Sequence, residues 1–180
     1  MFTELYPFRN GPQMNHFAVQ PGTKMLPDYL KKLGYRVVIA GKVDVYPQPD
    51  FEHIGEYFGK YSPISTRNDP RHVFTQFIQE NFKSNAEQPI CLIVSTWLPH
   101  VPWLKNETFD PATLTLPDYL VDTRETRQAL AAYYQSISAA DQMLGEVMQA
   151  LDDTGQQNNT VCMFFSDQGP QFPSAKWTTY

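Results

Sequence analysis

Residues 35–42, with the sequence YRVVIAGK, decide the fold class of this chain. At the centre of this stretch, residues 37–40 (VVIA) are apolar at four consecutive positions, and three of these residues are β-branched. A strand that is buried on both faces gives such a continuous apolar run, whereas a strand with one wet face alternates. We therefore predict a strand over 35–40 inside a parallel sheet, with Gly41 and Lys42 at its carboxyl end.

Helical and apolar patterns lie on both sides of this strand. A helix is predicted at about 25–33, because its apolar residues fall on one face and Gly34 follows it. Downstream, residues 44–70 carry Pro, Gly and Asp throughout and are predicted as a long loop. A second helix at about 71–83 and a second buried strand over 90–96 come next.

The C-terminal half contains the clearest helix of the sequence, at about 123–153. Asp122 is expected to cap it, and Glu125 three residues later completes a capping-box pattern. Gly155 ends the helix, and a third apolar run, residues 160–165, is predicted as a third buried strand.

The resulting order is helix, strand, helix, strand, helix, strand. This alternation predicts an α/β fold with a largely parallel sheet sandwiched by helices. In such sheets, ligands bind outside the carboxyl ends of the strands. The residues that follow the predicted strands there are Lys42, His100, Asp167 and Gln168.

Net charge and hydropathy exclude two classes of partner. The formal net charge of −5 argues against a nucleic-acid partner, which requires a basic face. No apolar run approaches the length of a membrane span. A local group of cations can still bind an anion within an acidic protein.

The residues at the strand ends suit the cleavage of an ester of a strong acid. Asp167 and Gln168 offer side-chain oxygens, the ligands that calcium and magnesium prefer. Lys42, His100 and the later Lys176 are donors suited to an anion such as sulfate or phosphate. A metal ion with converging cations is a common arrangement for this chemistry.

Each of these residues also has a simpler interpretation. Asp167 near Gly169 suits a turn, and Lys42 and Lys176 suit a solvated surface. His100, between two prolines, suits a loop. The functional interpretation depends on successive strands that all end in such groups.

Several segments then match, in order, a known family. They are YPFRNG at 6–11, MLPDYL at 25–30, LGYR at 33–36, AGK at 40–42, STWLPHVPW at 95–103, AYY at 132–134, SDQG at 166–169, FP at 172–173 and Lys176. Together they resemble the type I sulfatases of the alkaline phosphatase superfamily, and most of all the branch that contains N-sulfoglucosamine sulfohydrolases (heparan N-sulfatases).

This resemblance implies a calcium-dependent sulfuric ester hydrolase that acts on sulfate esters or N-sulfates of a carbohydrate such as a glycosaminoglycan. By position, Asp167 would bind calcium and orient the nucleophile, and Gln168 would be a second calcium ligand. Lys42 would hold the nucleophile and a sulfate oxygen. His100 and Lys176 would contact the sulfate and the leaving-group oxygen. The family's compartments, which are periplasmic, secreted or lysosomal, are implied without a choice among them.

The chain departs from the family at Asp44, where relatives usually carry a histidine. A carboxylate there can act as a base but would repel sulfate, which points to lost turnover or to a variant mechanism. The family's formylglycine, made from Cys or Ser in a Cys/Ser-x-Pro/Ala-x-Arg motif, has no counterpart in the sequence.

We therefore interpret residues 1–180 as a partial sulfatase catalytic domain that lacks the N-terminal nucleophile segment and the C-terminal part. Alone, the chain is expected to be inactive. Two alternatives stay open: an inactive sulfatase-like remnant that binds an anion or a partner, and a phosphodiesterase of the same superfamily.

Overall fold

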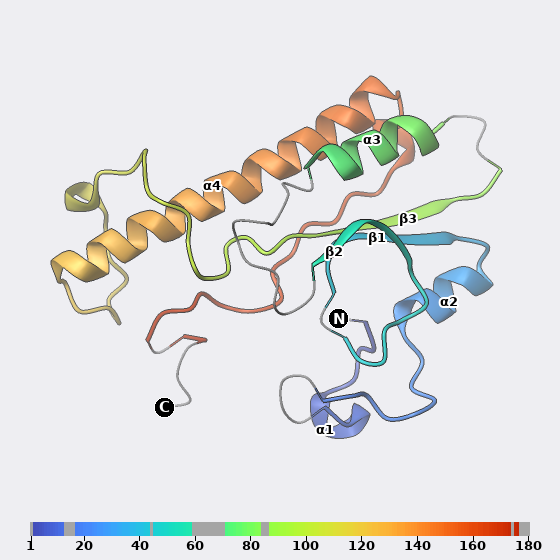
Figure 1. Ribbon diagram of the computed structural model, residues 1–180, viewed down its shortest axis with the longest axis horizontal. Helices are drawn as coiled ribbons and strands as arrows, with labels where there is room; N and C mark the ends of the chain where they lie inside the picture. Colours follow the sequence, from blue (N-terminus) through green and yellow to red (C-terminus); the bar gives the residue numbers. More distant parts are fainter. Residues whose placement is uncertain are drawn as a thin grey trace. The chain divides into compact units, whose positions relative to one another are not determined.

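Three parallel strands form the sheet of the computed structural model, in the order β2-β1-β3 (Figure 1). The central strand is β1 (Arg36–Lys42), with β2 (Glu52–Phe58) on one side and β3 (Ile90–Ser95) on the other. The apolar run predicted to be buried is fully covered, since residues 37–40 are each at most 1% exposed. The predicted α/β fold with a parallel sheet is confirmed.

The structure describes residues 2–12, 17–43, 45–58, 71–83, 87–173 and 175–176. The side chains of 56–58 and 71–72 are outside this description. Asp44 also lies outside the described residues, so the interpretation of its carboxylate stays a prediction. In the part of the chain that the structure describes, no helix has the length and apolar character needed to cross a bilayer.

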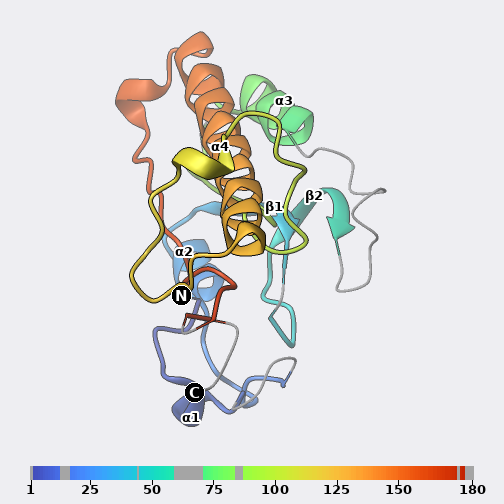
Figure 2. The ribbon, with the colours of Figure 1, turned by 90° about the vertical axis from the view of Figure 1, so that its left-hand side faces the viewer.

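Helices cover both faces of the sheet because the strand side chains alternate between the faces. On one face, Val37 and Ile39 of β1 belong to a buried cluster against which Leu30 of α2 (Leu26–Lys32) packs. On the other face, Leu92 of β3 packs against a cluster that contains Ile78 of α3 (Arg71–Asn81). Figures 1 and 2 show α2 and α3 on opposite sides of the strands. Both helices lie close to their predicted positions.

The long helix α4 (Arg124–Asp153) confirms the third predicted helix, but its cap differs from the prediction. Thr123, not Asp122, caps it: the Thr123 hydroxyl accepts a hydrogen bond from the Thr126 amide at 3.1 Å. Asp122 instead binds Arg127 through both carboxylate oxygens. Arg127, which lies one turn into the helix, therefore binds the Asp122 carboxylate, and the hydroxyl of Thr123 caps the helix. The described residues also contain α1 (Pro7–Asn10) and the 3-10 turns Pro111–Thr113 and Gln157–Asn159.

The chain separates into two compact units. The first contains residues 1–95 and 147–160, which include the sheet with α2 and α3. The second contains residues 96–146 and 161–180, which include most of α4 and the loops before and after it. Each unit is described by itself below.

Two predictions about strands are wrong. Residues 52–58 form β2 inside the predicted long loop, and residues 160–165 form no strand. The sequence of β2, EHIGEYF, lacks a continuous apolar run, so its strand structure comes from pairing with β1. The run at 160–165 is apolar but exposed, with Val161 at 87% and Phe164 at 73%, and no described residue pairs with it as a strand. Apolar sequence favours burial, but a strand also requires a neighbouring strand edge.

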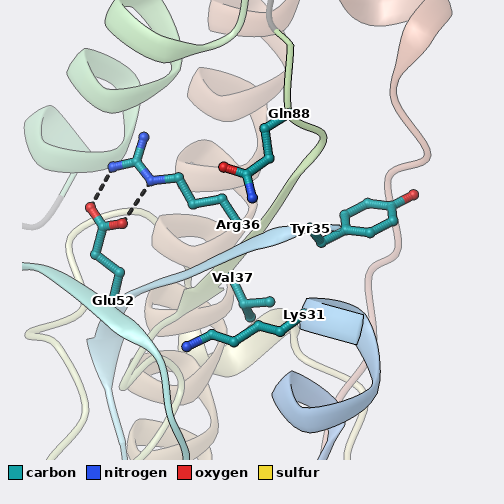
Figure 3. A pocket seen from close by; sticks show the side chains of 6 residues that line it. All are labelled: Lys31, Tyr35, Arg36, Val37, Glu52 and Gln88. Atoms are coloured by element: carbon teal, nitrogen blue, oxygen red, sulfur yellow. Dashed lines mark hydrogen bonds and ion pairs between the residues drawn. The ribbon is translucent and has the colours of Figure 1, made fainter. Parts of the chain in front are cut away.

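An ion pair joins the amino ends of β1 and β2 (Figure 3). Arg36 donates to both carboxylate oxygens of Glu52, with Nε to Oε2 at 2.7 Å. Its third nitrogen, Nη1, donates to Asn81 of α3 at 2.8 Å, and the guanidinium lies 5.1 Å from the centre of the Phe77 ring. One arginine therefore holds together two strands and a helix. The hydrogen bond from Arg36 lowers the pKa of Glu52, with a smaller contribution from the charge of Arg36.

This pair predicts a pH-dependent stability difference. A carboxylate whose pKa is lowered in the folded state stabilises the fold above its unfolded pKa, here 4.5, and loses that contribution as pH falls through the folded value. Arg36→Met should therefore cost about 1 kcal/mol at neutral pH, as expected for a partly exposed bidentate pair. The cost should shrink as Glu52 becomes protonated. Urea unfolding at neutral pH and at about pH 3 measures it.

A matched control for this prediction is Lys31→Met, which removes the more exposed ion pair between Lys31 and Asp50. Its effect should be smaller than that of Arg36→Met at neutral pH, because exposed pairs are screened by water. A cost of Arg36→Met that stays constant over this pH range would show that Glu52 is not responsible for it.

Candidate active site

Lys42 is the last residue of β1 and lies at the carboxyl end of the sheet. It follows Gly41, which has a φ of +96° and pairs in register with Ser95 at the end of β3. The pairing of β1 with β2 shifts register between Ala40 and Lys42, so the strand is irregular at this point. The side chain of Lys42 is half-buried. The two neighbouring strand tips therefore carry Lys42 and the start of the segment that leads to His100.

His100 lies in the second unit, in a tight loop directly after β3. Its amide donates to the Trp97 carbonyl at 2.6 Å, and its ring lies edge-on to Trp97 at a centroid distance of 5.7 Å. Its Nδ1 atom is 2.7 Å from the carbonyl oxygen of Val101. A carbonyl oxygen only accepts hydrogen bonds, so Nδ1 carries the proton of this bond. Exchange of a proton with a ligand therefore falls to the second ring nitrogen, Nε2.

An aromatic cluster anchors the same loop. Trp103 donates from its indole nitrogen to the Pro99 carbonyl at 3.0 Å. Its ring stacks on Phe172 at 4.7 Å and lies 5.7 Å from the ring of Tyr133 on α4. Phe172 is only 5% exposed. Stacked rings at these distances stabilise a contact beyond the area that they bury, so the loop around His100 is fixed on α4.

A hydrogen bond joins the His100 loop to the segment that contains Asp167, Gln168 and Lys176. The Val101 amide donates to Gln171 Oε1 at 3.0 Å, across 70 residues of sequence. Within this segment, the Ser166 hydroxyl donates to the Gln168 carbonyl at 2.8 Å, and the Lys176 amide donates to the Pro170 carbonyl at 3.1 Å. The second unit therefore brings together the segments that carry four of the predicted site residues.

The side chains of Asp167 and Gln168 have the oxygen chemistry that a hard cation requires, but they are too few for a complete site. Both residues are exposed. Calcium takes six to eight oxygen ligands, and the described residues contain no group of three His, Cys, Asp or Glu side chains placed to hold a metal ion. The two residues fit part of a calcium site, and other oxygens would have to complete it.

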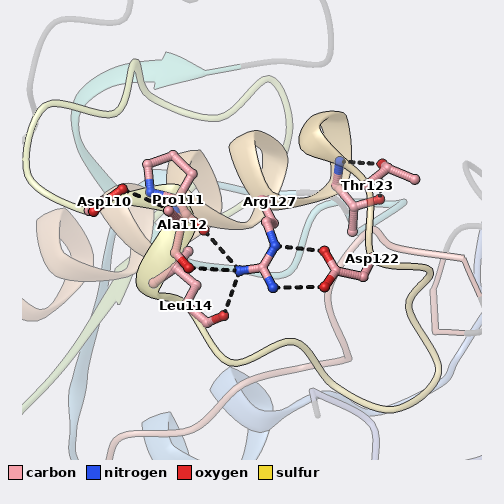
Figure 4. A network of polar contacts seen from close by, with 8 residues as sticks. Asp110, Pro111, Ala112, Leu114, Asp122, Thr123 and Arg127 are labelled. Atoms are coloured by element: carbon pink, nitrogen blue, oxygen red, sulfur yellow. Dashed lines mark hydrogen bonds and ion pairs between the residues drawn. The ribbon is translucent and has the colours of Figure 1, made fainter.

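Arg127 orders the loop before α4 (Figure 4). It binds Asp122 through two hydrogen bonds of 2.6 and 2.8 Å, and its Nη1 atom donates to the carbonyls of Pro111, Ala112 and Leu114 at 3.0–3.2 Å. The helix residue Arg127 gives that loop a defined course.

Three residues of this unit were not predicted from the sequence: Gln171, Arg127 and Ser136. Ser136 is 0% exposed on α4 and accepts a hydrogen bond from the Leu104 amide at 2.9 Å. A signal was present in the sequence, because a polar residue at a core position of a helix requires a hydrogen-bond partner. The identity of that partner depends on the tertiary fold.

Comparison with known proteins assigns the family. A family model described as Sulfatase matches residues 1–179. Over 172 residues, the chain is 27% identical to an ulvan-active sulfatase of Formosa agariphila, a match that covers 94% of this chain and 34% of that protein. Over 196 residues, it is 26% identical to the N-sulphoglucosamine sulphohydrolase of Homo sapiens, a match that covers 93% of this chain and 38% of that protein.

The fold has a counterpart among solved structures. A protein studied for the metabolism of multiple glycosaminoglycans by Bacteroides thetaiotaomicron superposes with a TM-score of 0.62 at 16% identity, covering 86% of this chain and 44% of that one. At this identity, the likeness concerns the fold alone.

The parallel sheet, with Lys42 at the end of β1 and the His100 loop after β3, defines an α/β domain, and the matching model gives the family. The chain belongs to the sulfatase family. It spans about a third of the length of these curated relatives, namely 34% and 38%.

Proposed function

We propose that the protein hydrolyses sulfate esters or N-sulfates on a carbohydrate. The observation that carries this proposal is the family match over residues 1–179, because that range contains every candidate site residue. Two relatives are named for ulvan and for N-sulphoglucosamine, and the name of the second describes an N-sulfated sugar. This supports a sulfated carbohydrate as the substrate class.

The proposed roles follow from the charge and the hydrogen-bonding capacity of each side chain. The ammonium groups of Lys42 and Lys176 would suit the sulfate oxygens, which carry negative charge before and during cleavage. The leaving-group oxygen gains negative charge as the bond to sulfur breaks. The charged form of His100 would donate a proton to that oxygen from Nε2, because Nδ1 is held by the Val101 carbonyl.

Calcium and a formylglycine are proposed from family membership. Asp167 and Gln168 would contribute oxygens to the calcium, which would supply positive charge next to the sulfate group when bound. The formylglycine would supply the nucleophile from a residue outside these 180. The described residues then have the tasks of binding the sulfate, orienting it and supplying the proton to the leaving group.

The test compares substrates in the protein at the length its gene encodes. We expect turnover of an aryl sulfate and of N-sulfoglucosamine, and at least about 100-fold lower kcat/KM for the matching aryl phosphate, because the chain belongs to the sulfatase family. Removal of calcium with a chelator should lower the rate. Preference for a phosphodiester would favour a phosphodiesterase. Anion binding without turnover would favour an inactive relative.

A further inference from the structure

We propose that Gln171 is a positioning residue that fixes the imidazole of His100. This inference rests on the proposed function, because it assigns His100 a part in the reaction. The side-chain oxygen of Gln171 binds the backbone of Val101, not a group that is proposed to touch the sulfate. Gln171 therefore acts on His100 through Val101.

Both polar backbone groups of Val101 form a hydrogen bond, one with Gln171 and the other with His100. The Val101 amide donates to Gln171 Oε1 at 3.0 Å. The Val101 carbonyl accepts from His100 Nδ1 at 2.7 Å. Val101 therefore connects the side-chain carboxamide of Gln171 to the imidazole of His100.

Loss of the Gln171 oxygen would free the Val101 amide to turn toward water. The Val101 carbonyl lies in the next peptide plane, which is joined to the amide plane at the Val101 Cα, so a change in the Val101 φ and ψ angles would move the carbonyl, and the bond that keeps the proton on Nδ1 would weaken. The imidazole would then populate both tautomers, and Nε2 would no longer be held in one direction. A side chain that orients a catalytic group in this way affects the rate without contacting the substrate.

The rest of the loop is held independently of Gln171. Trp103 stacks on Phe172 and lies against Tyr133, and the Leu104 amide donates to the fully buried Ser136 at 2.9 Å. Removal of one hydrogen bond at Val101 should therefore leave the loop folded. The consequence for His100 can then be measured apart from unfolding.

Gln171 also lies between the proposed calcium ligands, Asp167 and Gln168, and Lys176, which is proposed to bind the sulfate. It follows Gln168 by three residues and precedes Lys176 by five. The neighbouring Phe172 is buried, which fixes the backbone from which the Gln171 side chain extends. The Gln171 side chain thus holds the His100 loop to the segment that contains the proposed calcium ligands and Lys176.

The experiment uses three variants of the protein at its encoded length. Gln171→Met keeps the length of the side chain without the acceptor oxygen, and Gln171→Glu keeps an acceptor at the same reach. The matched control is Gln135→Met, because Gln135 Oε1 also accepts from a loop amide, that of Glu107 at 3.2 Å. The readouts are the tautomer of His100, from the ¹⁵N chemical shifts of its ring, and the kcat and KM for an aryl sulfate.

We expect Gln171→Met to mix the two tautomers and to lower kcat about tenfold with KM nearly unchanged, as for an interaction that matters in the transition state. Gln171→Glu should restore the single tautomer, and Gln135→Met should match the wild type. A single tautomer together with unchanged kcat in Gln171→Met would overturn the proposal. If the wild type turned over no sulfate, the proposed function would fail, and the ¹⁵N signature alone would decide the role of Gln171.

Discussion

Gly41→Ala is expected to lower the free energy of unfolding by about 3 kcal/mol or more. A Cβ atom at this position would lie 2.0 Å from the carbonyl oxygen of Ser95, and that oxygen belongs to the backbone of the paired strand. The φ of +96° adds strain for any residue with a side chain. Relief of the clash requires β1 and β3 to separate at the edge where Lys42 lies.

The matched control is Gly34→Ala, because Gly34 has a similar φ of +87° but no neighbouring atom within 4 Å of the point that a Cβ would occupy. It should cost only the backbone strain, about 1–2 kcal/mol. Urea unfolding of both variants separates the clash from the strain. Equal losses for the two variants would show that the strands adjust to the Cβ without cost, contrary to this prediction.

The elements that the sequence predicted correctly all have a strong local signal. The run at 37–40 is apolar without interruption, and α4 repeats apolar residues at helical spacing over 30 residues. Such signals arise from the period of the backbone itself, so they are visible without knowledge of the fold. The strand β3 and the helix α3 were found for the same reason.

The elements that it missed depend on partners far away in the chain. The strand β2 has a polar sequence and is ordered by β1, and the apolar run at 160–165 has no strand among the described residues to pair with. The cap of α4 moved by one residue because Arg127 binds Asp122. Pairing and ion-pair partners are tertiary properties, and no local period reveals them.

In the candidate site, too, some features could be predicted from the sequence and others depend on the tertiary fold. The residue types that follow the predicted strands were visible in the sequence, including His100 and Asp167. The hydrogen bond from Val101 to Gln171 was not, because it spans 70 residues and glutamine has no fixed role in a loop. The sequence therefore predicted chemical groups, and the structure added how one of them is held.

His100→Ala is expected to lower kcat for an aryl sulfate by about 10²–10⁴-fold, the range of general acid–base catalysis. The loss should be largest for a poor leaving group, since a leaving-group oxygen of high basicity depends most on a proton from Nε2. An aryl sulfate with a strongly acidic phenol should lose least. The measurement is kcat for a series of aryl sulfates with phenols of different acidity.

The matched control is His53→Ala, which removes an exposed histidine of β2 whose ring lies edge-on to Phe51 at 6.2 Å. It should leave kcat within about twofold, since the surface of β2 contributes no group to the proposed reaction. Added imidazole should restore part of the activity of His100→Ala, because it can enter the space left by the side chain and donate the same proton. An equal loss for all leaving groups would assign His100 to sulfate binding in place of proton donation.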